Sequence, residues 1–121
     1  MKARIALILI AAIVTACATP VTVRRAAVDV TFRATDNYVV GAYHFTKDAV
    51  YPVTYVDSAD GNYYVLGEGN FVDAGVKVTP EGTLADTHLY VDMGVYGGWS
   101  RHPGAEVKNG TVGLQMFEPV K

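Results

Sequence analysis

The side chains best suited to catalysis are few and widely separated in this chain of 121 residues. His44, His88 and His102 lie on three separate segments, and no two of them have the close spacing typical of paired metal ligands. Ser58 and Ser100 stand outside the Gly-x-Ser-x-Gly pattern that presents a nucleophilic serine. The sequence therefore predicts no catalytic residue, no metal site and no cofactor.

The segment 57–62, Asp-Ser-Ala-Asp-Gly-Asn, has enough side-chain oxygens to suggest calcium binding. An EF-hand loop needs oxygen ligands at its first, third and fifth positions and glycine at its sixth. Counted from Asp57, this segment places Ala59 third and Gly61 fifth, so the register fails. Asp-Gly between two runs rich in tyrosine and valine is typical of a hairpin turn, which we expect here instead.

The strongest chemical pattern lies at the amino terminus, before the only cysteine, Cys17. Lys2 and Arg4 make the first residues positive, and residues 5–14 form an unbroken apolar run. A charged start followed by a short apolar run is typical of a secretory signal peptide. A helix that spans a bilayer needs about 20 apolar residues. We therefore expect a signal peptide over residues 1–16 rather than a permanent transmembrane helix.

The end of this run, Val14-Thr15-Ala16-Cys17, resembles the lipobox of bacterial lipoproteins. It has an aliphatic residue, two small residues and then the cysteine that the lipid modifies. The resemblance implies cleavage between Ala16 and Cys17, a diacylglyceryl group on the Cys17 sulfur and acylation of the new amino terminus. The alternative is an ordinary secretory signal in which Cys17 is incidental. The resemblance covers only the first 17 residues.

The residue after the cysteine bears on localisation. In Gram-negative lipoproteins an aspartate there commonly retains the protein at the inner membrane, and Ala18 stands there instead. The resemblance thus implies a cell outer membrane protein held by its lipid, since two or more acyl chains anchor a protein stably. In an organism without an outer membrane, the same signal implies the outer face of the cytoplasmic membrane.

A short tether, residues 17–25, joins the expected lipid to the domain. Its last eight residues contain no spacer rich in glycine and serine, and they span at most about 26–29 Å when extended. We therefore expect the domain to lie close to the membrane. Arg24 and Arg25 either contact headgroups or form a solvated pair at the start of a strand.

Residues 26–121 are expected to form one domain, because the chain is 50% hydrophobic and 18% charged and shows no repeat or shift in composition. Its formal charge is −2, and loss of Lys2 and Arg4 with the signal peptide lowers it to −4. No basic field is left to attract nucleic acid.

Apolar and polar residues alternate with a period of two, as in Val28, Val30 and Phe32. Turn residues separate the short runs, which predicts an all-β fold, a small antiparallel sandwich or barrel of seven to eight strands. Pro52 cannot donate a ladder hydrogen bond, so its run belongs at a sheet edge or bulge. The clearest predicted strands are 28–33, 38–45, 49–56, 63–68, 71–78, 88–96 and 111–117.

Alternation also divides the predicted strands into two faces. The inward sets are Val72, Ala74, Val76 and Val78, and Leu89, Val91, Met93 and Val95. The outward set of the second strand includes Tyr90 and Tyr96, and the segment 97–104 reads as a loop that presents Trp99 and Arg101. Aromatic and arginine side chains are enriched in interfaces, so these four are candidate partner contacts. The alternative is that they are packing residues, with Trp99 folded back onto the domain.

Two classes of function remain. The first is a lipid-anchored envelope protein, not an enzyme, that binds a protein or polymer next to the membrane as an envelope component, assembly factor, inhibitor or exclusion factor. The second is a small lipid-anchored periplasmic enzyme or ligand carrier. We favour the first, because no catalytic constellation is visible and a domain of this size leaves little volume for a cavity.

Overall fold

The computed structural model describes residues 23–26, 28–69, 72–94 and 98–120. Every strand pair in this part of the chain is antiparallel, which confirms the predicted all-β antiparallel fold. The strands are β1 (Val23–Arg25), β2 (Thr31–Ala34), β3 (Tyr38–Val40), β4 (Tyr43–Phe45), β5 (Val50–Pro52), β6 (Tyr55–Asp57), β7 (Tyr63–Leu66), β8 (Ala74–Val78), β9 (Leu84–Asp92), β10 (Trp99–Glu106) and β11 (Phe117–Val120).

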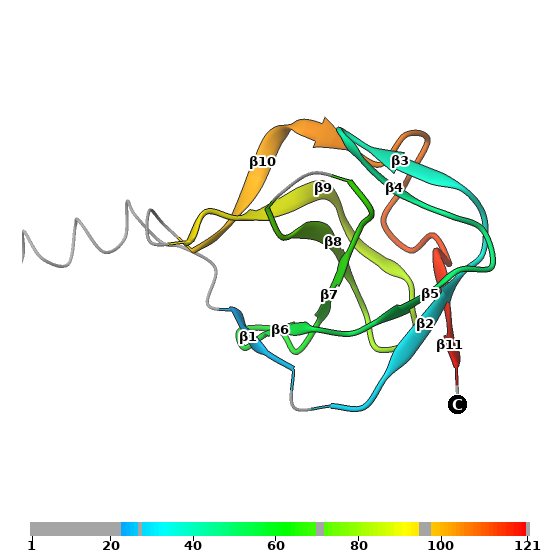
Figure 1. The fold of residues 1–121 in the computed structure, drawn as a ribbon, viewed down its shortest axis with the longest axis horizontal. Coiled ribbons are helices and arrows are strands. Elements are labelled where there is room, and N and C mark those ends of the chain that lie inside the picture. The colour runs from blue at the N-terminus through cyan, green and yellow to red at the C-terminus, as the bar shows by residue number, and fades with distance from the viewer. Residues whose placement is uncertain (1–22, 27, 70–71, 95–97, 121) are drawn as a thin grey trace, which may run out of the picture.

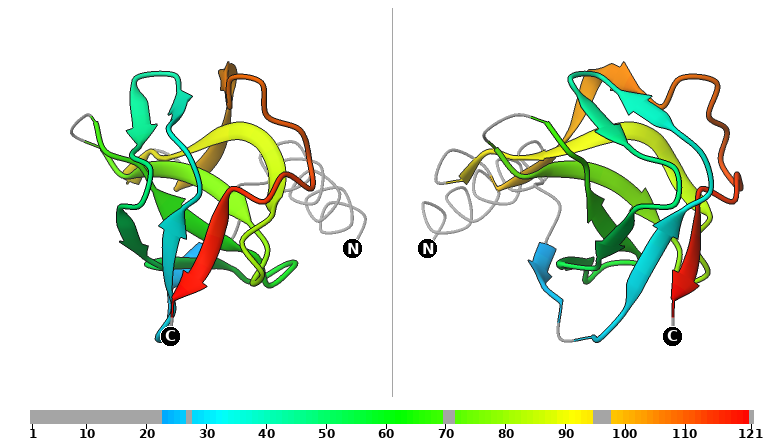
Figure 2. Two further views of the ribbon diagram at one scale, coloured as in Figure 1. Left: turned by 90° about the vertical axis from the view of Figure 1, so that its right-hand side faces the viewer. Right: turned by 45° about the vertical axis from the view of Figure 1, so that its right-hand side comes forward.

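These strands form three sheets (Figure 1). The largest has the order β1-β6-β7-β8-β9-β10, a smaller one has the order β11-β2-β5, and β3 and β4 form a hairpin. The small sheet lies on the side of the domain that faces the viewer in the left panel of Figure 2. Isolated bridges tie the hairpin to the large sheet, from Val40 to Val107 beyond β10 and from His44 to Glu68 beyond β7.

The described strands are shorter and more numerous than predicted. The run 38–45 is a hairpin rather than one strand, because Gly41 has a φ of 60° and turns the chain between β3 and β4. The run 49–56 is likewise divided, into β5 and β6. Pro52 ends β5, an edge strand of the small sheet, which agrees with the missing N–H of proline.

Two segments near the carboxyl terminus differ most from expectation. The predicted strand 111–117 is mostly irregular, with a turn at 112–113 and a single bridge at Gln115, and β11 begins only at Phe117. The segment from Trp99 onward was expected to be a loop, but it forms β10 and pairs with β9. The register shifts between His102 and Glu106, so Pro103 is accommodated in a bulge. The prediction of a loop was wrong because a bulged strand can contain residues that favour turns.

The main hydrophobic core lies between the large and the small sheet. Ala74, Val76 and Val78 point into it from alternate positions of β8 and are almost fully buried, as predicted. From the small sheet come Phe32 and Phe117, whose ring centroids are 5.7 Å apart. The burial of these large side chains supplies most of the favourable free energy of folding.

The opposite face of the large sheet carries a second cluster of four buried aromatic residues. Trp99 belongs to β10 and Tyr55 to β6, with three strands between them in the sheet, yet their ring centroids are 4.8 Å apart. Such a contact requires the sheet to curl around this face. Tyr64 fills the centre of the cluster, with ring centroids 5.1 Å from those of both Trp99 and Tyr90.

The edges of the two larger sheets are protected against pairing with other chains. Three of the four edge strands contain a proline, which removes a donor from the ladder: Pro52 in β5, Pro103 in β10 and Pro119 in β11. The fourth edge, β1, is only three residues long and has Arg24 and Arg25 exposed. Contact with a partner is therefore better sought on the faces of the domain than by strand addition.

The curl brings β7 and β8 so close together at Gly75 that no side chain fits there. A Cβ atom at this position would overlap the carbonyl oxygen of Val65 and lie 2.9 Å from the Cα atom of Leu66. Gly104 in β10 is different, because the nearest atom to its Cβ would be His102 Cε1, 3.7 Å away.

We expect Gly75→Ala to lower the free energy of unfolding by about 2 kcal/mol or more, because the β7 backbone must move. Gly104→Ala is the matched control and should change it by less than about 0.5 kcal/mol. Urea unfolding of the two variants measures the difference. Equal midpoints would show that β7 and β8 are not in this close contact.

Candidate contact groove

The main core opens to solvent at the end of β9. Along one face of this strand the exposed fraction rises from 3% for Leu89 to 8% for Val91 and 50% for Met93. Val72, before β8, is also 50% exposed. Val72 and Met93 belong to the predicted inward sets, and that prediction was wrong for both because the core does not extend over them. Val95, the last predicted member, lies outside the described residues.

These side chains line a groove of about 410 Å³. Its floor is formed by Leu89 and Val91 on the apolar face of β9, and the half-exposed Val72 and Met93 form part of its rim. The turn of the β3–β4 hairpin, residues 41–43, supplies one wall, and β10 supplies the other through His102, Gly104 and Ala105. The hairpin wall is held against the large sheet by its two bridges and by the Tyr43 hydroxyl, which donates to the Val72 carbonyl oxygen at 3.1 Å.

A second hollow, of about 420 Å³, continues the groove past Val72 and Met93, which line both. It adds the carboxylates of Asp73 and Asp92. The Tyr55 hydroxyl donates to Asp73 Oδ2 at 2.8 Å, and the Gly94 N–H donates to Asp92 Oδ1 at 2.9 Å. In the described part of the chain neither carboxylate forms an ion pair. The groove therefore ends in two carboxylates that are positioned by hydrogen bonds and have no described cationic partner.

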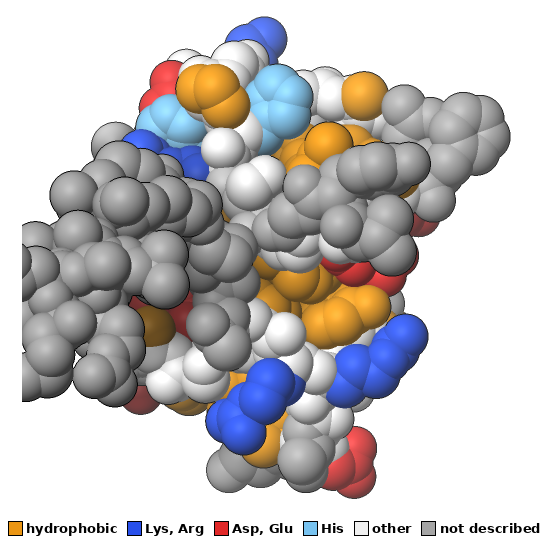
Figure 3. All heavy atoms as spheres, turned by 90° about the vertical axis from the view of Figure 1, so that its left-hand side faces the viewer, with side chains coloured by type: hydrophobic (Ala, Val, Ile, Leu, Met, Phe, Trp, Pro, Cys, Tyr) orange, Lys and Arg blue, Asp and Glu red, His pale blue; other side chains and the backbone are white. Residues whose placement is uncertain are grey.

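β1 and the end of β9 lie on the same side of the domain, the left-hand side in Figure 1. Figure 3 views this side and shows hydrophobic side chains at the surface, with acidic side chains on one side of them and basic side chains on the other. The described chain starts at Val23 in β1, on the side of the domain where the groove ends.

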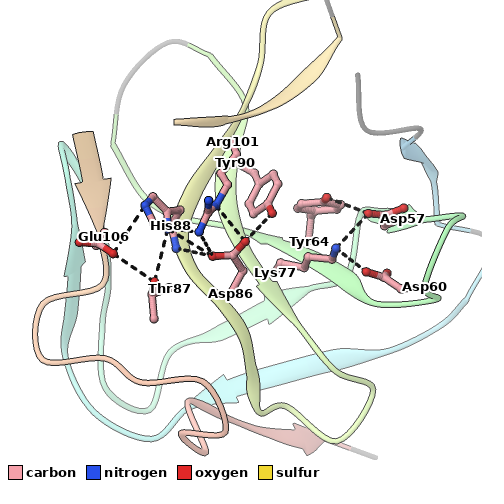
Figure 4. A network of polar contacts seen from close by, with 10 residues as sticks. All are labelled: Asp57, Asp60, Tyr64, Lys77, Asp86, Thr87, His88, Tyr90, Arg101 and Glu106. Atoms are coloured by element: carbon pink, nitrogen blue, oxygen red, sulfur yellow. Dashed lines mark hydrogen bonds and ion pairs between the residues drawn. The ribbon is translucent and has the colours of Figure 1, made fainter. Parts of the chain in front are cut away.

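The other face of β9 carries a polar network centred on Asp86 (Figure 4). The Tyr90 hydroxyl donates to Asp86 Oδ2 at 2.6 Å, and Arg101 reaches both carboxylate oxygens, with Nε at 3.1 Å and Nη2 at 3.2 Å. Burial alone would raise the pKa of Asp86. Hydrogen bonds from Tyr90, from the His88 N–H and from Arg101 outweigh burial and lower this pKa to about 2.

The network also includes both nitrogens of the His88 ring. Nδ1 lies 2.7 Å from Arg101 Nη2 and 3.3 Å from Asp86 Oδ1. Nε2 lies 3.6 Å from Glu106 Oε1. Each polar group of this cluster is engaged by a neighbour, so the network holds β9 and β10 in register.

A second polar cluster lies beside it on the same face, between β6 and β8. Asp57 is 2% exposed and accepts from Lys77 Nζ at 3.1 Å and from the Tyr64 hydroxyl at 3.2 Å. Lys77 also pairs with Asp60. Burial opposes the charge of Lys77, but its bonds to Asp60 and Asp57 outweigh burial and raise its pKa. The predicted hairpin at 57–62 is confirmed, and Asp57 in it forms a buried ion pair with Lys77.

The structure separates the four predicted contact residues. Tyr90 and Trp99 are 5% and 4% exposed in the aromatic cluster, so the prediction that they face outward was wrong. Because the sheet curls, both faces of β9 are covered, and Trp99 folds back onto Tyr55. Arg101 is exposed, with 53% of its side chain accessible, but it is held by Asp86. Tyr96 lies outside the described residues.

The remaining sequence candidates are not brought into one site. His88 belongs to the polar network, His102 lines the groove, and His44 lies 3.8 Å from Glu68 Oε2 on the hairpin. The described residues contain no group of three or more histidine, cysteine or acidic side chains that could hold a metal ion. Cys17 and the lipobox residues Val14, Thr15 and Ala16 lie outside the described residues.

Sequence reasoning missed the groove and the hub of the polar network. Asp86, His88 and Tyr90 alternate along β9, and this pattern of hydrogen-bonding side chains on one face was a usable signal. No local pattern marks Asp73 and Asp92, because they meet only through the pairing of β8 with β9. No local pattern marks His102 as a groove residue either, because the hairpin turn 41–43 and Val72, which line the groove with it, are far from it in sequence.

No protein-family model, curated protein or solved structure matches this chain. Within the described residues, no helix has the length and apolar character needed to cross a membrane. The function must therefore be inferred from the sequence motif and the geometry of the domain.

We expect Trp99→Ala to lower the free energy of unfolding by about 3–5 kcal/mol, because it removes the buried ring that packs on both Tyr55 and Tyr64. Arg101→Ala should lower it by only about 1 kcal/mol, since its ion pair is half exposed. Urea unfolding followed by circular dichroism compares the two. A Trp99→Ala variant as stable as the parent would mean that Trp99 does not hold the curl.

Acid should weaken the domain through Asp86. The folded pKa of about 2 lies below the ordinary value of 3.8, so this carboxylate stabilises the fold above about pH 4 and loses that contribution as the pH falls toward 2. Asp86→Asn should therefore reduce stability by about 1 kcal/mol at neutral pH, after allowance for solvent screening, and flatten the pH dependence between 4 and 2.

The exposed Asp29 provides the control for this measurement, because Asp29→Asn removes the same charge from the surface. Thermal melts of both variants across this pH range give the comparison. Identical pH profiles for the parent and Asp86→Asn would show that the network does not lower this pKa.

Proposed function

We propose that the protein is a lipid-anchored lipoprotein of the bacterial cell envelope that acts without catalysis, by binding a protein or polymer next to the membrane. The observation that carries this proposal is the order of the first 17 residues: two positive charges, an apolar run and Val14-Thr15-Ala16-Cys17. The lipid on Cys17 attaches the domain to the membrane, and Ala18 favours the outer membrane.

The geometry of the domain supports action close to the lipid. Five residues separate Cys17 from Val23, the first residue of β1, and even fully extended the six Cα-to-Cα steps reach only about 20–22 Å. The exposed Arg24 and Arg25 follow at once and suit contact with headgroup phosphates. A partner of this domain must therefore lie within a few nanometres of the membrane surface.

The surface that supports binding is the groove along β9. Met93 and Val72 at its rim are half-exposed, and hydration of these apolar side chains is unfavourable in the free protein. Their burial against a partner is therefore favourable. Its volume also suits a small ligand, so ligand carriage is the second candidate. We favour contact with a macromolecule because the groove runs open past Val72 and Met93 into the second hollow.

Cys17→Ala should abolish lipid labelling and release the protein from membranes. Cys17 is the only cysteine of the chain, so no other thiol can form the thioether to the lipid. The test is labelling of cells with a palmitate analogue, followed by separation of membranes. Thr15→Ala keeps a small residue at its position and should retain the label. Label on the Cys17→Ala variant would contradict the proposal.

Localisation has its own variant. Ala18→Asp should move the protein from the outer to the inner membrane fraction, as the lipobox resemblance implies for a Gram-negative cell. An unchanged distribution on a density gradient, with lipid labelling intact, would contradict the outer-membrane assignment while leaving the anchor in place.

A further inference from the structure

We infer that the groove binds a protein segment in which an apolar side chain lies next to a lysine or arginine. This inference deepens the proposed function, because it takes the membrane-proximal partner to be a protein and names the chemistry that the groove recognises. The apolar side chain occupies the part of the groove over Leu89 and Val91, and the cation lies in the hollow between Asp73 and Asp92.

The apolar part of the groove is built from the core strand itself. Leu89 and Val91 are buried on the same face that Met93 continues into solvent, so an inserted side chain extends an existing core. The floor is fixed by strand pairing on both sides, with β8 and β10. Met93 at the rim is flexible and adapts to side chains of different shape.

The charge of the adjoining hollow determines the sign of the partner. Asp57, Asp60 and Asp86 each have a lysine or arginine partner within the domain. Asp73 and Asp92 have none in the described part of the chain, although both line the same hollow. Two carboxylates beside an apolar groove favour a cation supplied by the bound molecule.

The positions of these carboxylates are set in advance. Asp73 is held by the Tyr55 hydroxyl, and Asp92 by the backbone N–H of Gly94. Tyr55 in turn packs on Trp99, so the acidic end of the groove is tied to the aromatic cluster. A site organised in this way loses little side-chain entropy when a cation binds.

The same charges disfavour a bilayer surface as the occupant. Anionic headgroups would meet Asp73 and Asp92 directly, and like charges repel. Arg25 lies near this end, with its guanidinium over the Tyr55 ring at 5.4 Å from the centroid. It forms no ion pair with Asp73 or Asp92, so the second hollow keeps both negative charges.

The test is photo-crosslinking in living cells with the full chain. A benzophenone amino acid replaces Met93 at the rim of the groove or, as a control, Val112, which is 68% exposed and does not line the groove. Mass spectrometry of the products identifies the crosslinked molecule and the residues attached. We expect Met93, and not Val112, to give a protein segment that carries lysine or arginine within about one turn or two strand positions of the attachment point.

The charge contribution is measured in the same cells. Asp73→Asn combined with Asp92→Asn keeps both hydrogen-bond acceptors and removes both charges, and should lower the crosslink yield about five-fold. Asp29→Asn combined with Glu118→Gln removes two charges at exposed positions elsewhere and should leave it unchanged. Thermal melts of both double variants check that the fold is kept.

Several results would overturn the inference: no product from Met93, a phospholipid, a second copy of this chain, a segment without a basic residue, or equal yields from the two double variants. Palmitate labelling of the same cells reports the anchor separately. A labelled protein with no basic partner segment leaves the proposed anchor standing and removes this inference. An unlabelled protein with the expected crosslink does the reverse.

Discussion

The contact between Trp99 and Tyr55 is the constraint on which the rest of the domain depends. It joins strands β10 and β6 across a six-stranded sheet and so requires the sheet to curl. The curl covers the face that would otherwise be open to water, buries Tyr64 and Tyr90, and demands a glycine at position 75. This small domain has a single six-stranded sheet, and the curl of the sheet allows aromatic side chains to be buried on both of its faces.

The two faces of β9 have different roles, one in the core and the groove and the other in the polar network. One face supplies Leu89 and Val91 to the core and then Met93 to the groove. The other face carries Asp86, whose bonds to Tyr90 and Arg101 keep β9 and β10 in register. Because the register is fixed by this second face, the apolar floor of the groove keeps its shape without help from a bound partner.

The sequence was sufficient for those features that depend on neighbouring residues. Alternation of apolar residues predicted the all-β class, Asp60-Gly61 predicted the hairpin at 57–62, and Pro52 predicted an edge strand. Each of these follows from the conformational preferences of one or two residues.

The features that depend on curvature and long-range pairing were out of reach. Alternation assigns one face of a strand to water, and this assumption failed for Tyr90 because the sheet curls. Trp99 was placed in a loop because glycine and proline surround it, whereas a bulge lets β10 contain them. The groove depends on the position of the β3–β4 hairpin, which is set by long-range contacts such as the bridges to Val107 and Glu68 and the packing of Phe45 on Phe117.

One apolar face of β9 is sealed inside the core at Leu89 and open as a groove at Met93. Met93 and Met116 are the only methionines after Met1, and they are 50% and 0% exposed. In protein labelled with ¹³C on the methionine methyl groups, a soluble paramagnetic agent should broaden the Met93 signal strongly and leave the Met116 signal sharp. Equal protection of both signals would show that the groove is closed, and equal broadening would show that the core is not sealed.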